Sequence, residues 1–191
     1  KPNTGKSTLT NLLVGKDISI VSDIAGTTRD VVMGSFNYKG TDFTVLDTAG
    51  IRRKSKVEED VEYYSVNRAI KTIDEADVVL LMIDSVEGLA DQDKKIANLI
   101  VRRGKGIILV LNKIDLLAGI GNELEAIKDR VRFLFPILNF APITSISALQ
   151  GQDIGKLLDM VWTVWKQLNK RVDTARLNES IKVWGEAYQP P

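Results

Sequence analysis

Two stretches of this 191-residue chain contain no polar side chain, and they constrain its fold more than any other feature. They are Val78–Ile83 and Ile107–Leu111, each of strand length. Strands without polar and apolar alternation are buried on both faces, as in parallel sheets covered by helices. Helical patterns separate the apolar runs at the spacing of βαβ units. The sequence therefore predicts an α/β fold with a mostly parallel sheet and helices on both faces.

Further elements complete the predicted sheet and its helical cover. Val31–Tyr38 and Phe43–Leu46 flank the turn Lys39–Asp42, which predicts an antiparallel hairpin at one edge. Ile143–Ile146 predicts a shorter strand. A one-sided apolar stripe predicts the clearest helix, and we expect its two tryptophans to pack rather than bind a ligand. The stripe comprises Ile154, Leu157, Leu158, Val161, Trp162, Trp165 and Leu168.

The pattern restarts near the end of the chain. Asp173 or Thr174 can cap a further helix, which stops before Pro190. Its apolar positions are Leu177, Ile181, Trp184 and Tyr188. A single helix cannot bury such a face alone, so it docks on the first domain or belongs to a second one. We therefore divide the chain into residues 1–170, one domain, and residues 171–191, a linker and the first helix of a following domain.

The chain begins with the second half of a phosphate-binding loop. Lys1–Thr8 matches the end of the Walker A pattern, whose first glycine and preceding strand are absent from this sequence. Backbone N–H groups at a helix N-terminus point at polyphosphate, Lys6 neutralises its charge, and the Ser7 hydroxyl can bind Mg²⁺. The predicted nucleotide-binding residues of this loop are Asn3, Thr4, Gly5, Lys6, Ser7 and Thr8. Taken alone, a chance Gly-Lys-Ser turn before an ordinary helix is the alternative.

Polar clusters follow four of the predicted strands. They are Asp47–Gly50, Asp84, Asn112–Asp115 and Ser147–Leu149. Ligands of α/β sheets bind beyond the carboxyl ends of the strands, so these clusters predict one composite site. In the first cluster, the Asp47 carboxylate can hold Mg²⁺ through water and the Gly50 N–H can meet a γ-phosphate.

The cluster Asn112-Lys113-Ile114-Asp115 predicts which base is bound. Guanine presents N1–H and N2–H₂ donors side by side, and the Asp115 carboxylate accepts both, whereas adenine would leave that charge unpaired. We expect Asn112 to tie the loops together and the Lys113 stem to cover the ring face. The backbone of Ser147, Ala148 and Leu149 can donate an N–H to guanine O6.

The amino-acid composition limits which catalytic groups and metals the chain can use, and where in the cell we expect it. The chain has no cysteine and no histidine, which excludes disulfides, thiolate zinc sites, cysteine nucleophiles and imidazole bases. Oxygen-bound metals such as Mg²⁺ remain. No apolar run approaches the length of a membrane span and no signal peptide is visible, so we expect a cytoplasmic protein without a membrane partner. The missing initiator methionine and first strand lead us to expect an excerpt of a longer polypeptide.

These motifs resemble the translation-factor-related GTPases, and within them the second G domain of the Der (EngA) family. The resemblance covers essentially the whole chain and is carried by four segments in addition to the motifs above. These are Ile24–Asp30, Asp47–Lys54, Tyr64–Ala69 and Gln92-Asp93. The tRNA-modification GTPase family MnmE shares Gly26–Asp30 but lacks the Arg52–Lys54 and Tyr64–Val66 features. Ile114 departs from the pattern, because Der usually has tryptophan there.

The resemblance implies a P-loop NTPase fold of the Ras-like G-domain type, with one antiparallel edge strand and its first strand outside this chain. It implies a slow GTPase that takes GTP, GDP and Mg²⁺ and acts in assembly of the large ribosomal subunit. The implied partners are rRNA, that subunit, an upstream G domain and a KH-like domain that begins in residues 171–191. A non-hydrolysing GTP-dependent binding module and an MnmE-like tRNA-modification subunit are the alternatives.

The resemblance also assigns roles to single residues. Asn3 would help to hold a K⁺ ion that stimulates hydrolysis, unless its amide only stabilises the loop. Thr28 would bind Mg²⁺ when γ-phosphate is present, so the implied catalytic set is Asn3, Lys6, Thr28 and Gly50. Ile51 stands where Ras-like enzymes carry a glutamine that orients water, and an aliphatic side chain cannot do this. Beyond it, Arg52, Arg53, Lys54 and Lys56 form a basic cluster that is either a solvated loop or a contact to RNA or a partner domain.

Overall fold

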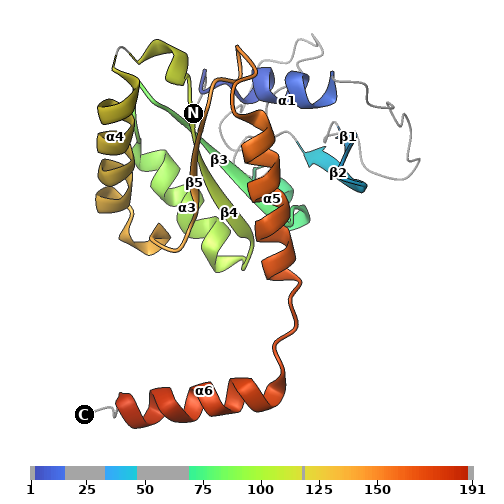
Figure 1. Cartoon of the computed structure of the whole chain (residues 1–191), viewed down its shortest axis with the longest axis vertical. Helices are drawn as coiled ribbons and strands as arrows, with labels where there is room; N and C mark the ends of the chain where they lie inside the picture. The colour runs from blue at the N-terminus through green and yellow to red at the C-terminus, as the bar shows by residue number, and fades with distance from the viewer. Residues whose placement is uncertain (1–2, 16–32, 47–68, 118, 189–191) are drawn as a thin grey trace, which may run out of the picture.

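The computed structural model describes residues 3–15, 33–46, 69–117 and 119–188. Its centre is a parallel sheet of three strands in the order β3-β4-β5, seen in Figure 1. The strands are β3 (Val78–Asp84), β4 (Gly106–Asn112) and β5 (Ile143–Ile146). All seven residues of β4 are buried, as the wholly apolar run Ile107–Leu111 predicts for a central strand. The predicted parallel sheet is confirmed.

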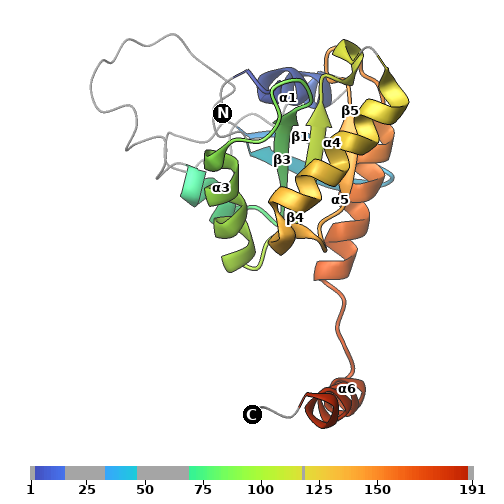
Figure 2. The same cartoon turned by 90° about the vertical axis from the view of Figure 1, so that its left-hand side faces the viewer.

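Helices cover both faces of this sheet, also as predicted (Figure 2). On one face, Ile107, Leu109 and Leu111 pack with α3 (Asp91–Arg102) and α4 (Ile120–Leu134). On the other, Ile108 and Val110 pack with α1 (Lys6–Val14) and α5 (Ile154–Leu168). The alternation along β4 is the two-residue period of a strand. The remaining described helices are residues 69–75, the 3₁₀ turns η1 (Ile114–Leu116) and η2 (Pro136–Leu138), and α6 (Thr174–Ala187).

The predicted hairpin is present, but its turn is shorter than expected. β1 (Met33–Tyr38) and β2 (Thr41–Leu46) pair antiparallel, with Tyr38 opposite Thr41. The turn is therefore only Lys39-Gly40, and the prediction of a four-residue turn was wrong. Both residues have positive φ, 52° and 76°, which is the two-residue turn whose twist matches that of the strands. Residues 31 and 32 of the predicted strand lie outside the described residues.

The tip of this hairpin is tied to α5. Asp159 of α5 accepts a hydrogen bond from Tyr38 Oη at 2.9 Å and pairs with Lys39 Nζ at 2.5 Å. The hydrogen bond and charge of Lys39, with the Tyr38 hydroxyl, hold the pKa of Asp159 below its ordinary value, and Asp159 in turn raises the pKa of Lys39. Trp162 donates to Thr41 Oγ1 at 3.4 Å. Among the described residues the hairpin is a sheet of its own, joined to the domain by side chains.

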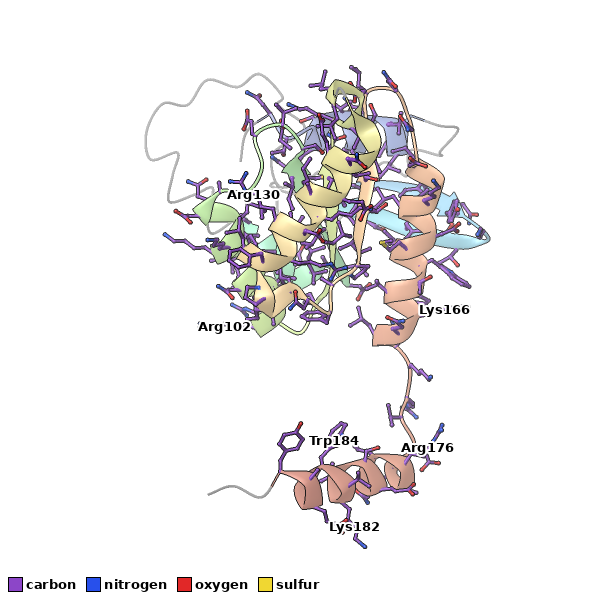
Figure 3. All side chains as sticks on the ribbon, turned by 60° about the vertical axis from the view of Figure 1, so that its left-hand side comes forward. Arg102, Arg130, Lys166, Arg176, Lys182 and Trp184 are labelled. Atoms are coloured by element: carbon purple, nitrogen blue, oxygen red, sulfur yellow. The ribbon has the colours of Figure 1, made fainter. Side chains whose placement is uncertain are left out.

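The last helix lies apart from the sheet and its covering helices. α6 starts at the predicted cap, Asp173, whose carboxylate accepts from the Ala175 N–H at 2.7 Å. None of its residues is buried, and Figure 3 shows Trp184 on a helix remote from the domain. Docking on the first domain, one of the two expected alternatives, is thus not observed in the described part of the chain. No helix among the described residues is long and apolar enough to cross a membrane.

Candidate functional site

The polar residues at the carboxyl ends of the strands line up across the sheet. Asp84 is in register with Asn112, which is in register with Ile146, and Ser147 follows directly. The predicted shared rim is therefore confirmed for these clusters. Asp84 and Asn112 are the last residues of their strands, whereas the sequence placed them just after.

The first described loop ends at the N-terminus of α1, next to this rim. Gly5 is the residue before the helix, with φ of +89°, and no side chain caps the helix start. The first turn contains no acidic residue, so no side chain of this turn offers a competing negative charge to its backbone N–H groups. Lys6 Nζ lies 3.2 Å from Thr4 Oγ1. Asn3, Ser7 and Thr8 are exposed. This arrangement suits an anion such as phosphate.

Asn112 joins that loop to the loop after β5. Its Nδ2 donates to the Thr4 carbonyl oxygen at 2.9 Å, and its Oδ1 accepts from the Ala148 N–H at 2.9 Å. Asn112 is 2% exposed, so both bonds are shielded from water. The predicted role of Asn112 in tying the loops together is confirmed.

Gly5 is required at this junction for a reason that the motif alone does not give. A Cβ on Gly5 would lie 2.1 Å from Asn112 Nδ2, far inside van der Waals contact. Any larger residue would push away the amide that holds the two loops. The close approach of Gly5 and Asn112 thus sets both the shape of the loop and the place of the helix start.

Lys113 leaves β4 in a left-handed conformation and forms an ion pair with Asp84. Its φ is +68°, and its Nζ lies 2.6 Å from Asp84 Oδ2. Asp84 Oδ1 accepts from the N–H groups of Val86 at 2.9 Å and Glu87 at 3.2 Å. Burial by itself raises the pKa of Asp84, but the hydrogen bond from Lys113, the two backbone bonds and the Lys113 charge outweigh it and keep that pKa below 3.8. The sequence placed Asp84 at the rim without a role, because pairing with Lys113 depends on register.

Asp115, in η1, carries a carboxylate oxygen without a partner. Its Oδ1 is covered and accepts no hydrogen bond from the described residues. An unpaired buried oxygen of this kind is costly, so it indicates a donor that binds there. The residue itself is half-exposed, so a ligand can approach its carboxylate from solvent.

The loop after β5 offers few spare backbone donors. Ser147 N–H pairs with the Gln152 carbonyl at 3.3 Å, and Ala148 N–H is taken by Asn112. The Leu149 side chain is 77% exposed. The contact of this loop with a base therefore stays a prediction, with Ala148 sharing its N–H or Leu149 supplying its own.

Several predicted site residues lie outside the described residues. They are Thr28, Asp47 and Gly50 of the predicted site, Ile51, and the basic cluster Arg52, Arg53, Lys54 and Lys56. Of the predicted Mg²⁺ ligands only Ser7 is described. In the described ranges no group of three acidic side chains could hold a metal ion.

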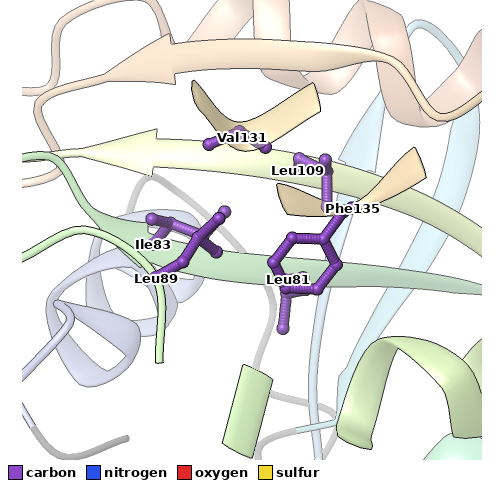
Figure 4. A pocket seen from close by; sticks show the side chains of 6 residues that line it. All are labelled: Leu81, Ile83, Leu89, Leu109, Val131 and Phe135. Atoms are coloured by element: carbon purple, nitrogen blue, oxygen red, sulfur yellow. The ribbon is translucent and has the colours of Figure 1, made fainter. Parts of the chain in front are cut away.

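One internal space beside the sheet does not belong to this site. Figure 4 shows it between β3, β4 and α4, lined by apolar side chains. It has no room for a water molecule. Its lining residues are Leu81, Ile83, Leu89, Leu109, Val131 and Phe135. We interpret it as a packing gap of the core.

Comparisons with known proteins agree on one family. Residues 1–113 match the family model described as 50S ribosome-binding GTPase. GTPase Der from Borrelia garinii is 49% identical over 188 residues, 98% of this chain and 43% of that protein. GTPase Der from Treponema pallidum is 46% identical over 191 residues, 100% of this chain and 42% of that protein. The chain thus spans less than half the length of these relatives.

The fold is also that of solved GTPase structures. A structure of Era in complex with MgGDPNP and part of 16S ribosomal RNA superimposes with a TM-score of 0.67 and 38% identity. The match covers 91% of this chain and 56% of Era. The predicted α/β P-loop fold is confirmed.

Proposed function

We propose a function from the premise that this chain belongs to the family of 50S ribosome-binding GTPases, whose model matches more than half of it. It binds GTP and GDP and hydrolyses GTP slowly, and it acts in assembly of the large ribosomal subunit. The names of its relatives and the match to the family model support this assignment. We also propose that it works in the cytoplasm, where ribosomes are assembled.

The junction at Asn112 is the observation that carries the proposal. One buried amide connects the loop before α1 to the loop after β5, and Asp115 lies three residues beyond it with an unpartnered oxygen. A ligand that spans this junction needs an anionic end for the helix N-terminus and paired donors for the carboxylate. A guanine nucleotide has both, because its N1–H and N2–H₂ donors lie side by side.

The residues proposed for the phosphate end of the site have different roles. We propose that Lys6 neutralises phosphate charge, that Gly50 donates its N–H to the γ-phosphate, and that Ser7, Asp47 and Thr28 hold Mg²⁺. The exposed Ser7 hydroxyl at the start of α1 is consistent with this role. When bound, Mg²⁺ would offset negative charge that develops on the phosphates. Asn3 would hold K⁺, and its exposed place in the loop leaves its amide accessible.

The partners follow from the same assignment. We propose that the basic cluster Arg52, Arg53, Lys54 and Lys56 contacts rRNA in a manner that depends on the bound nucleotide. Residues 1–170 would form the G domain, and 171–191 would open a KH-like domain. An upstream G domain would precede them. The exposed apolar side chains of α6, such as Trp184 at 62%, are consistent with a helix that needs a further domain.

Replacement of Asp115 by asparagine tests the guanine assignment. Asp115→Asn removes the negative charge and replaces one of the two acceptor oxygens by an NH₂ group, which cannot accept from guanine N2–H₂ but can donate to the C2 carbonyl of xanthine. We expect the affinity for GTP to fall about 1,000-fold or more, because buried polar mismatches are penalised strongly. The affinity for xanthosine triphosphate should rise relative to that for GTP. Equilibrium binding of both nucleotides gives the comparison. Asp91→Asn, at a carboxylate 93% exposed on α3, is the matched control. Unchanged GTP affinity in Asp115→Asn would refute guanine recognition by this residue.

A further inference from the structure

We propose that Asp84 is a positioning residue for guanine recognition, which acts by holding the Lys113 side chain in place before the base arrives. This inference rests on the proposed function, because it assigns the base to the surface that Lys113 covers. It adds a residue of β3 to the base-recognition residues, which otherwise come from the loop after β4 and the loop after β5.

The carboxylate of Asp84 is built into the rim on both of its oxygens. It is only 2% exposed, Oδ2 pairs with Lys113 Nζ at 2.6 Å, and Oδ1 accepts two backbone N–H bonds from the following turn. A buried charge is tolerated when it is paired and hydrogen-bonded in this way. The two backbone bonds fix the direction of the carboxylate, and so they fix where the ammonium group sits.

Lys113 has the geometry of a tethered cover. Its backbone is left-handed, and it stands between Asn112, which holds the loops, and Asp115, which has the unpartnered oxygen. Its side chain is 30% exposed, so part of the stem remains available for contact. A lysine stem has four rotatable bonds, and ordering it on a ligand weakens binding. The ion pair at its tip removes much of that freedom in the free protein, so the base meets a side chain that is already ordered.

The competing interpretation is that Asp84 only shapes the turn at Val86 and Glu87. The two interpretations differ in whether the effect of Asp84 passes through Lys113. In Asp84→Asn, Oδ1 can still accept the two backbone bonds, while the new Nδ2 cannot accept from Lys113. This variant therefore removes the tether and retains the turn.

A double-mutant cycle with a fluorescent GDP decides between them. Dissociation constants are measured for the wild-type protein, Asp84→Asn, Lys113→Ala and the double variant, after subtraction of any binding that persists in Asp115→Ala. We expect Asp84→Asn to weaken GDP about three- to tenfold, from the cost of ordering one long side chain. We expect the double variant to bind within about twofold of Lys113→Ala. An unchanged affinity in Asp84→Asn, or losses that multiply in the double variant, would overturn the proposal.

Two further measurements keep the outcome clear. Melting temperatures identify a variant that fails to fold. If Asp84→Asn fails to fold, Lys113→Met, which keeps the apolar stem but cannot pair with Asp84, should bind GDP more weakly than the wild-type protein. A GDP affinity of Lys113→Met equal to that of the wild-type protein would refute the proposal. If the wild-type protein binds no guanine nucleotide, the proposed function itself fails. If it binds and the Asp84 variant is unaffected, only the positioning role fails.

Discussion

Substitution of Gly5 by alanine probes the junction of the site with a single methyl group. The new Cβ would lie 2.1 Å from Asn112 Nδ2 and 3.4 Å from Asn112 Cγ. The nearest atom belongs to a side chain, so the amide can move. Its movement breaks the bonds that Asn112 makes with Thr4 and Ala148, both 2.9 Å long and buried.

The expected loss of stability has two parts. The φ of +89° costs an alanine about 1–2 kcal/mol. Displacement of Asn112 leaves buried polar groups unpaired, at about 1–3 kcal/mol. The free energy of unfolding should therefore fall by about 2–5 kcal/mol. Gly104→Ala is the matched control, because Gly104 has φ of +64° and an added methyl group would meet nothing within 4 Å, so only the first part applies.

Urea denaturation of both variants, followed by tryptophan fluorescence, measures the difference. Guanine-nucleotide affinity should fall in Gly5→Ala and stay unchanged in Gly104→Ala, because only the first variant disturbs the site. Equal destabilisation of the two variants would show that backbone strain accounts for the whole effect. The steric role of Gly5 against Asn112 would then be refuted.

Three further outcomes test the core, the hairpin and the phosphate loop. Ile108→Ala, at a side chain with 0% exposure, should lower the free energy of unfolding by about 2–5 kcal/mol. Phe133→Ala, at 83% exposure, should change it by less than about 0.5 kcal/mol. Similar losses for the two variants in urea titrations would contradict the assigned core. The pKa of Asp159 is lowered, so its link to the hairpin is fully present above pH 3.8, the ordinary pKa of this carboxyl, and is lost as the pH falls through the lowered pKa. The pKa of Lys39 is raised, so the link is fully present below pH 10.5, the ordinary pKa of this amine, and is lost as the pH rises through the raised pKa. Between these pH limits, backbone amides of the hairpin should therefore exchange more slowly in the wild-type protein than in Asp159→Asn. Equal exchange rates in the two proteins would refute a stabilising role for this link. GTP hydrolysis should be faster in KCl than in NaCl, and Asn3→Ala should erase the difference; a salt preference that survives would leave this amide with a role in stabilising the loop only.

The sheet and its helical cover could be predicted from sequence because their signals are local. A wholly apolar run such as Val78–Ile83 reports burial on both faces by itself, and the bounds of α5 follow from one apolar stripe. The turn of the hairpin was predicted two residues too long, because Thr41 and Asp42 are polar and resemble loop residues. They are strand residues because a positive φ at both Lys39 and Gly40 lets the chain reverse in two positions.

The site was predictable where one residue type fits one chemical role, and less so where two residues act as a pair. Asn112 and Asp115 were predicted from the donors and acceptors of a base. The loop-tying bonds of Asn112 are confirmed, and the contact of Asp115 with a base stays a prediction. The pairing of Asp84 with Lys113 joins strands β3 and β4, so it appears only when their register is known. The clash that would follow a side chain at Gly5 involves Asn112, far along the sequence, and likewise needs the folded chain.

In the proposed site, these pairwise contacts would couple base recognition to phosphate binding. Asn112 connects the residue before Gly5 to the loop that would face the base, so a shift of either loop is transmitted through two short buried bonds. Because buried hydrogen bonds are lost in full when their geometry fails, the junction tolerates little displacement. In the proposed site, a base that displaced Asn112, the neighbour of Lys113, would therefore also displace the loop before α1. Discrimination between bases would then involve the phosphate end of the proposed site as well as its base end, which a set of independent contacts could not provide.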